Sequence, residues 1–224
     1  MNNQQIRLNK FLAERLGVSR READDLIVAG SVTVNAKPPI LGAKIDKNDK
    51  VCYNKKIVPF QTEFSYLAFN KPAGYVCSRK AQGSAPTLYE LLPKKYHHLK
   101  TVGRLDKDTS GLILLTNDGD FAFQMTHPKF HKTKIYEVEL DKPLEPLHQQ
   151  MISDYGVMLE DGPSQFTVVH DGNKYIVTLS EGRNRQIRRT FAALGYRVVK
   201  LHRTSFGKYE LNGLAPGKCA IIKP

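Results

Sequence analysis

The sequence predicts an α+β protein of two domains, a small mixed domain followed by a larger one with a largely antiparallel sheet. Apolar residues at helical spacing dominate the first sixty positions, whereas short apolar or alternating stretches recur from position 63 onward, as in strands. A chain of 224 residues is long enough for two domains. Pro59, followed by polar residues at 61 and 62, is typical of a linker. We therefore expect domains at 1–58 and 63–224, joined by a linker at 59–62.

Two helices and a hairpin are expected in the first domain. Apolar side chains at helical spacing run through 11–16, and Gly17 follows as a stop signal. Ser19 and Glu22 have the spacing of a capping box, in which each side chain bonds the backbone N–H of the other residue, so a second helix should start there. Residues 32–34 then alternate between apolar and polar, which is typical of a half-buried strand.

The second domain is expected to contain several short strands and one amphipathic helix. Ile187, Phe191 and Leu194 share one face of the segment QIRRTFAAL, which predicts the helix. Strand-like stretches alternate or run apolar over five to seven residues in the rest of the domain. The expected strands are YLAFN, LILLT, KIYEVEL, KYIVTLS and YRVVKL.

The charge of the chain predicts a polyanionic partner. Lys and Arg number 34 against 22 acidic residues, a net charge of +12, and nucleic acid is the first candidate. Arg20 and Arg21 fall in the first turn of the second helix, where the helix dipole disfavours each cation by roughly 0.3 to 1 kcal/mol. A bound phosphate would offset this unfavourable interaction with the dipole. Lys44 is the first residue of a lysine-rich stretch that we expect beside the two arginines. The alternative is a solvated arginine pair on a generally basic protein.

Several classes of protein are excluded or disfavoured. Cys52, Cys77 and Cys219 lack the spacing of a disulfide framework or a zinc site, so we expect no metal and a reducing cytoplasmic location. No apolar signal segment or stretch able to span a membrane is present. P-loop, Rossmann, zincin and nucleophile-elbow motifs are missing, so we expect no cofactor. The lack of a heptad repeat gives no reason to expect more than a monomer.

One segment, GRLDKDTSGLILLTNDGD at 103–120, concentrates polar side chains in a loop ahead of an apolar strand. A rigid strand is a good support for a functional loop. Asp106 and Asp108 allow three interpretations: local turn chemistry, a metal-chelating pair, or one catalytic carboxylate with the second aspartate holding the loop. The spacing alone does not choose among them.

Two resemblances to known families follow from the motifs. The run RLNKFLAERLGVSRREADDLIVAGSVTVNAKPP at 7–39 resembles an S4 RNA-binding domain, and the resemblance covers roughly residues 6–52. The run GRLDKDTSG resembles the signature of pseudouridine synthases, in particular the branch that modifies ribosomal RNA and carries an S4 domain. Three further stretches match that branch: FNKPAGYVCS at 69–78, KTKIYEVEL at 132–140 and EGRNRQIRRTFAALGYRVVKLHR at 181–203.

The resemblance implies a fold and an activity. The fold would be a small S4-type domain followed by a catalytic domain on a largely antiparallel mixed sheet with flanking helices. The activity would be isomerisation of a uridine to pseudouridine in ribosomal RNA or an assembly intermediate, which needs no cofactor. The stretch NKPAGYVCS is closer to the small-subunit enzymes and GRNRQIRR to the large-subunit ones, and we favour the small subunit. A ribosome-assembly factor that binds RNA without catalysis is the alternative.

The resemblance also implies site residues. Asp106 would be the catalytic carboxylate, Arg188 the guanidinium that pairs with it, and Tyr136 the ring that stacks on the target base, although spacing alone would make Tyr136 a core residue of a strand. His127 and Pro128 resemble a family loop near the active site and are given no catalytic role. Besides Arg20, Arg21 and Lys44, the residues expected to contact RNA are Lys71, Arg104, Arg183, Arg185 and Arg189.

Overall fold

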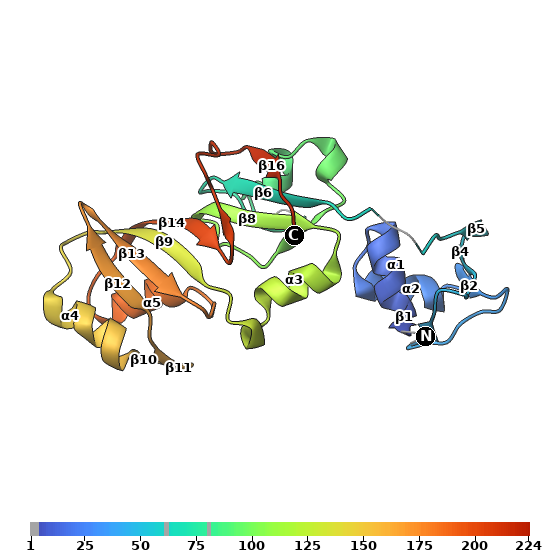
Figure 1. The fold of residues 1–224 in the computed structure, drawn as a ribbon, viewed down its shortest axis with the longest axis horizontal. Helices are drawn as coiled ribbons and strands as arrows, with labels where there is room; N and C mark the ends of the chain where they lie inside the picture. The colour runs from blue at the N-terminus through green and yellow to red at the C-terminus, as the bar shows by residue number, and fades with distance from the viewer. Residues whose placement is uncertain (1–4, 61–62, 80–81) are drawn as a thin grey trace. The chain divides into compact units, whose positions relative to one another are not determined.

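The computed structural model describes residues 5–60, 63–79 and 82–224. The chain divides into two compact units, Met1–Ser65 with Asn117–Gly119, and Tyr66–Thr116 with Asp120–Pro224 (Figure 1). Gln61 and Thr62 of the expected linker lie outside the described residues.

The first unit contains the two helices and the hairpin that the sequence predicts. Helix α1 ends at Gly17, whose φ of 71° is left-handed and favours glycine. The capping box at the start of α2 is formed, because Ser19 Oγ accepts from Glu22 N at 3.1 Å and Ser19 N donates to Glu22 Oε2 at 2.6 Å. The elements are β1 Ile6–Arg7, α1 Leu8–Leu16, α2 Arg20–Val28, β2 Val32–Val34, β3 Lys44–Ile45, β4 Val51–Tyr53 and β5 Lys56–Ile57.

The first unit has its own hydrophobic core, formed where the two helices meet the hairpin. Phe11 and Leu12 of α1 are fully buried there, beside Ala23 of α2 and Val32 of β2. The strands β2, β4 and β5 form an antiparallel sheet, and β1 pairs with β3. The buried faces of both helices are the ones that the apolar spacing predicts.

The second unit is built on one mixed sheet, with the strand order β12-β13-β9-β14-β8-β6-β16 and with β15 and β7 attached to β14 and β8. The pairings are antiparallel except for β8 with β14, which is parallel. The predicted largely antiparallel sheet and all five predicted strands are confirmed. The strands are β6 Tyr66–Lys71, β7 Lys100–Val102, β8 Ser110–Thr116, β9 Lys134–Leu140, β12 Thr167–Asp171, β13 Lys174–Leu179, β14 Val198–Phe206, β15 Tyr209–Glu210 and β16 Cys219–Ile221.

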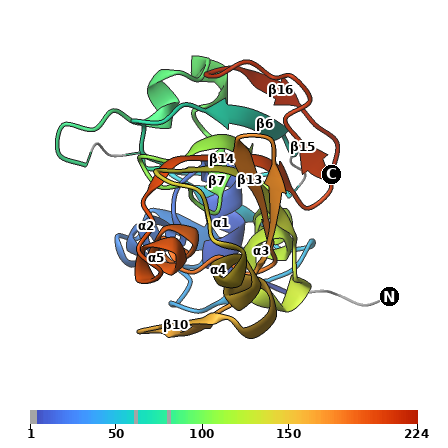
Figure 2. The ribbon, with the colours of Figure 1, turned by 90° about the vertical axis from the view of Figure 1, so that its left-hand side faces the viewer.

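Helices and a separate hairpin flank this sheet. The predicted helix is α5, and α3 was not predicted. Figure 2 views the unit from the end that carries α4 and α5. The remaining elements are the helices α3 Gly119–Thr126, α4 Pro146–Gln150 and α5 Gln186–Ala193, the short helices η1 Leu88–Glu90, η2 Lys94–Tyr96, η3 Pro128–Phe130 and η4 Met151–Tyr155, and the hairpin strands β10 Val157–Leu159 and β11 Gly162–Ser164. Among the described residues no helix is both long and apolar enough to cross a membrane.

Successive side chains of β8 point to opposite faces of the strand and pack in two separate hydrophobic clusters. Ile113 and Leu115 pack in one cluster, which also holds Phe191 of α5. Leu112 packs on the opposite face in a cluster with Met125 of α3. Because successive side chains of a strand point to opposite faces, the two helices cover opposite sides of β8. The loop before β8 is thereby attached to a strand that is buried on both faces.

Gly111, at the start of β8, permits the close approach of the parallel strand β14. Its φ is +108°, and a Cβ atom there would lie 2.2 Å from the backbone oxygen of Arg203. Such a distance is shorter than any real Cβ contact, so only glycine fits. The close approach of the two strands places Arg203 beside Gly111, immediately after the loop that contains the two aspartates.

Candidate active site

A cleft of about 440 Å³ opens in the second unit. Five segments of the chain line it, contributed by the loop 102–109, the end of α3, strand β9, the turn 179–187 and strand β14. It brings together five of the predicted site residues, and it adds Lys134 and Arg203, which the sequence interpretation missed. The predicted residues in its lining include Arg104, Asp106, Tyr136, Arg183 and Arg185.

Asp106 lies in the loop that precedes β8. Its backbone oxygen accepts a hydrogen bond from Thr109 N at 3.1 Å, which closes a turn. The carboxylate is 34% exposed, and its Oδ2 lies 3.8 Å from Arg185 Nη1. Asp106 is therefore a half-buried carboxylate at the cleft wall with one guanidinium beside it.

Asp108 has more arginine contacts than Asp106. Arg185 donates two hydrogen bonds to its carboxylate at 3.0 and 3.1 Å, and Arg188 Nε lies 3.4 Å from Oδ2. Burial alone would raise the pKa of Asp108, but the hydrogen bonds from Arg185 and the charge of Arg188 outweigh it and hold that pKa below its ordinary value. The hydrogen bonds with Asp108 in turn raise the pKa of Arg185.

The expected pairing of Arg188 with Asp106 is therefore replaced by a different arrangement. Arg188 is largely buried and donates to two backbone oxygens, of Asp108 at 2.9 Å and of Val198 at 2.8 Å. These bonds fix its guanidinium between the loop and β14, so its ion pair is with Asp108. Arg185, which was expected only to contact RNA, is the arginine that reaches both carboxylates.

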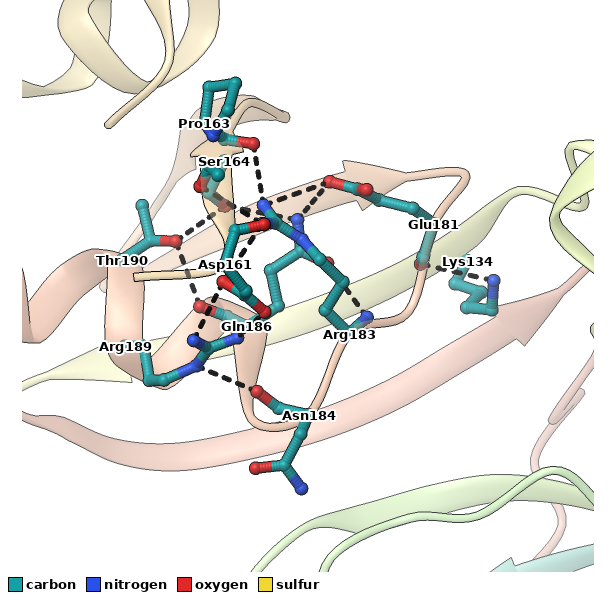
Figure 3. Close-up of polar contacts among 11 residues, drawn as sticks. Lys134, Asp161, Pro163, Ser164, Glu181, Arg183, Asn184, Gln186, Arg189 and Thr190 are labelled. Atoms are coloured by element: carbon teal, nitrogen blue, oxygen red, sulfur yellow. Dashed lines mark hydrogen bonds and ion pairs between the residues drawn. The ribbon is translucent and has the colours of Figure 1, made fainter. Parts of the chain in front are cut away.

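Arg183 and Arg189 converge on Asp161, at the turn of the β10–β11 hairpin (Figure 3). Arg189 donates to both carboxylate oxygens at 2.9 and 2.8 Å, and Arg183 Nη1 donates to Oδ1 at 3.1 Å. The hydrogen bonds from Arg189 and the charge of Arg183 hold the pKa of Asp161 below its ordinary value. Two of the arginines that were predicted to contact RNA are thus paired with a carboxylate of the chain itself.

Buried polar side chains anchor the same segment from beneath. Gln186 Nε2 donates to Ser164 Oγ at 3.1 Å and to the carboxylate of Glu181. Thr190 Oγ1 donates to Ser164 Oγ at 2.8 Å (Figure 3). Since Gln186, Ser164 and Thr190 are nearly fully buried, their mutual bonds satisfy groups that water does not reach. The start of α5, with Arg185 and Arg188, is thereby held against the β10–β11 hairpin.

Tyr136 is a buried residue of β9 whose ring borders the cleft. Arg203 of β14 is 3% exposed, and its Nη1 donates to Tyr136 Oη at the long distance of 3.5 Å. Its Nε donates to the backbone oxygen of Leu112 at 2.8 Å, and its guanidinium lies 4.7 Å from the ring centroid of Phe206. Arg203 thus holds the hydroxyl end of Tyr136 from inside the sheet.

Lys134 is a second cation of the cleft that was not predicted as a site residue. Its ammonium group donates to three backbone oxygens, of Lys132 and Ser180 at 3.2 Å and of Glu181 at 3.3 Å. Burial, with the charge of Arg203 as a second cause, lowers its pKa to about 8. Lys134 therefore ties the turn before α5 to strand β9.

The prediction that Lys71 contacts RNA is wrong. Lys71 is fully buried at the end of β6, and its ammonium group donates to the backbone oxygens of Pro72 at 2.8 Å and Lys107 at 3.4 Å. Burial lowers its pKa. The side chain braces the loop that holds the two aspartates, and it has no surface to offer a phosphate.

The remaining predicted RNA contacts are accessible. Arg104 is exposed at the cleft, next to the loop's buried Leu105. In the first unit Arg20, Arg21 and Lys44 are all exposed. Their contacts with RNA stay predictions.

No group of three or more His, Cys, Asp or Glu side chains among the described residues could hold a metal ion. Asp106 and Asp108, the pair that the sequence allowed as chelators, have guanidinium partners instead. Cys52, Cys77 and Cys219 are free thiols.

Comparisons with known proteins agree with the two-part architecture. The family model described as RNA pseudouridylate synthase matches residues 65–193, and the S4 domain model matches residues 6–38. A solved structure described as a pseudouridylate synthase is 33% identical, with a TM-score of 0.70, over 97% of this chain and 96% of that one.

Two curated proteins illustrate the relationship at the level of sequence. The ribosomal small subunit pseudouridine synthase A of Pasteurella multocida is 40% identical, over 95% of this chain and 94% of that protein. The ribosomal large subunit pseudouridine synthase B of Bacillus subtilis is 34% identical, over 97% and 92%. The chain therefore belongs to the RNA pseudouridylate synthase family and carries an S4 domain at its N-terminal end.

Proposed function

We propose that this enzyme converts one uridine of ribosomal RNA to pseudouridine, with the small subunit as the favoured substrate and Asp106 as the catalytic carboxylate. The observation that carries the proposal is the position of Asp106, a carboxylate in a cleft that also contains Tyr136 and a guanidinium. Relatives named for small-subunit RNA are more similar to this chain than the relative named for large-subunit RNA cited above. That ranking supports the small subunit.

The reaction leaves the atomic composition of the nucleotide unchanged. The N1–C1′ bond breaks, the uracil turns, C5 bonds to C1′, and the proton of C5 is lost while N1 gains one. A carboxylate can assist in two ways, by attacking C1′ as a nucleophile or by removing a proton from the sugar. Asp106 presents a half-buried carboxylate at the cleft wall, which suits both roles.

The arginines position the carboxylate in this proposal. Arg185 lies near Asp106 but makes its two direct hydrogen bonds with Asp108. A guanidinium held by the second aspartate orients the first carboxylate by charge without occupying its oxygens. Arg188 fixes Asp108 from the side of β14. Asp108 is thus a positioning residue, and Asp106 keeps an oxygen for the sugar.

The uridine must leave its stack before a side chain can reach C1′. Tyr136 borders the cleft from β9, where a ring can replace the stacking that the base loses. The volume of the cleft, about 440 Å³, falls in the range of small-molecule sites, so one everted nucleotide is a reasonable occupant. Arg104 at the rim can then contact the backbone of that nucleotide.

RNA recognition is divided between the two units. The exposed Arg20, Arg21 and Lys44 would contact phosphates of structured RNA through the S4 domain. Replacement of all three by Gln should weaken RNA binding and make its salt dependence less steep, by about one unit of slope for each lost phosphate contact. An unchanged slope would refute this role. We propose a cytoplasmic location, because the three cysteines are free thiols and the RNA partner is ribosomal, and a monomer, because the sequence has no heptad repeat.

The two competing functions predict different behaviour. Metal-dependent cleavage by Asp106 and Asp108 would require a cation to displace the bidentate Arg185, and it predicts cut RNA and inhibition by EDTA. A binding factor without catalysis predicts RNA affinity and no chemistry. The presence of the carboxylate, the ring and the arginines in one cleft supports the enzyme.

Tritium release tests the function directly. Ribosomal RNA and assembly intermediates carrying tritium at C5 of uridine would be prepared from cells that lack this protein, separately for the two subunits. We expect release from small-subunit RNA at a single uridine, without metal and without chain cleavage. Release from large-subunit RNA alone would move the target to that subunit, and no release from either would contradict the proposed function.

A further inference from the structure

An exposed aromatic and basic cluster adjoins the cleft, formed by Phe123, His127, Lys129 and Phe130. Phe123 of α3 is 45% exposed and Phe130 of η3 is 36% exposed, so two large apolar rings lie together at the surface. The ring of Phe123 lies 4.6 Å from that of His127 and 5.8 Å from that of Phe130, measured between centroids. The mechanism proposed above uses none of these side chains.

The cluster combines ring faces with positive charge. Lys129 Nζ lies 5.1 Å from the ring centroid of Phe123 and 4.8 Å from that of Phe130. His127 Nδ1 accepts from the backbone N–H of Lys129 at 3.3 Å, which fixes the turn that presents them. Aromatic side chains interleaved with cations bind single-stranded nucleic acid, because bases stack on the rings while phosphates meet the charges.

The cluster and one part of the rim of the cleft belong to the same continuous segment of the chain. Thr126 and Pro128, which flank His127, both line the cleft that contains Asp106. A nucleotide bound at Asp106 would therefore have its chain neighbours close to these rings. When the target uridine is everted, a neighbouring base loses a stacking partner, and an exposed ring can replace it.

We infer that Phe123 and Phe130, with Lys129, form a stacking site for an RNA base next to the target uridine. The inference rests on the proposed function, because the neighbouring base is defined by the uridine in the cleft. RNA is the occupant rather than a protein, since the cluster is basic and contiguous with the cleft for a nucleotide. The site would help hold the RNA open while the uridine is everted.

The test places the fluorescent base 2-aminopurine on either side of the target uridine in an RNA fragment. Stacking on a ring should quench its emission when wild-type enzyme binds. Phe123→Ala and Phe130→Ala should each lose quenching on one flank and lower kcat/KM for tritium release by about five- to 150-fold, the range of one base stack. Tyr155→Ala is the matched control, because Tyr155 is an exposed aromatic residue of η4 and is 76% exposed.

Conservative variants separate stacking from folding. Phe123→Leu keeps an apolar side chain against its neighbours but removes the ring, so it should behave like Phe123→Ala. Phe123→Tyr should restore quenching and rate. Lys129→Gln should reduce the salt slope of binding by about one.

The outcomes distinguish this inference from the proposed function. A wild-type enzyme that binds RNA but releases no tritium would contradict the proposed function. A wild-type enzyme that turns over, with both alanine variants and the leucine variant at wild-type rate and quenching, would overturn the stacking site. An effect of the alanine variants on thermal stability without any change in quenching would also overturn it, since the cluster would then be packing within the protein.

Discussion

Replacing Asp108 by Asn separates the roles of the two aspartates ahead of β8. The change keeps the size of the side chain and removes its charge, so the bidentate bond from Arg185 and the ion pair with Arg188 are lost together. Asp106 remains in place, but the guanidinium beside it is no longer held by a second carboxylate. We expect an enzyme with lower kcat and preserved RNA binding.

The structure gives the size of the effect. Hydrogen bonds to charged groups contribute about 1.5 to 3 kcal/mol each when shielded from water. The carboxylate of Asp108 is 48% exposed, so solvent screens it, and we take about 1 to 2 kcal/mol for the whole arrangement. If that free energy serves to orient the site, kcat falls about five- to thirtyfold. RNA affinity should be equal or slightly tighter, because one negative charge has gone.

Single-turnover tritium release gives the chemical rate, and filter binding gives the affinity. Asp154→Asn serves as control, because Asp154 is an exposed aspartate of η4 in the same unit. If Asp108→Asn were folded yet as inactive as Asp106→Asn, Asp108 would share in the chemistry and its positioning role would be refuted. A rate equal to wild type would show that the arginine contacts do not orient the site.

Three further changes test the supporting structure. Gly111→Ala should lower the free energy of unfolding by at least about 3 kcal/mol, since the new Cβ meets the backbone of Arg203 at φ +108°, and an unchanged denaturation midpoint would argue against the close approach. Lys134 loses its proton near pH 8 when folded but near 10.5 when unfolded, so the unfolded chain binds more protons between these values. The stability of wild type relative to Lys134→Met should therefore rise from pH 8 to 10, and a fall would contradict the burial of this amine. Asp161→Asn should lower kcat and steepen the salt dependence of RNA binding, because Arg183 and Arg189 are released; an unchanged slope would mean that they stay bound elsewhere.

The parts of the fold that local chemistry determines could be predicted from the sequence. The capping box of Ser19 and Glu22 requires only residues three positions apart, and it forms as expected. The five strands were found because their apolar patterns fit a pleated sheet. Helix α3 was not predicted. In its segment, GDFAFQMT, Phe123 is exposed and Met125 is buried, so the apolar residues do not mark a single buried face of a helix.

The partners within the site could not be predicted, because they depend on contacts between distant segments. Four arginines between 183 and 189 are equivalent in the sequence, yet two of them converge on Asp161 and two on the loop of Asp108. Lys71 precedes a proline turn, where exposure is the usual expectation, but β6 is buried on both faces and takes the side chain inside. Arg203 carries no local signal that separates it from other basic residues of its strand.

Asp106→Asn gives the most direct measurement of the proposed chemistry. Tritium release from C5-labelled ribosomal RNA should be abolished by this substitution, while the affinity for that RNA stays within about twofold of wild type, since the fold and the basic surface are unchanged. Release at the wild-type rate would show that the carboxylate of Asp106 takes no part in the isomerisation.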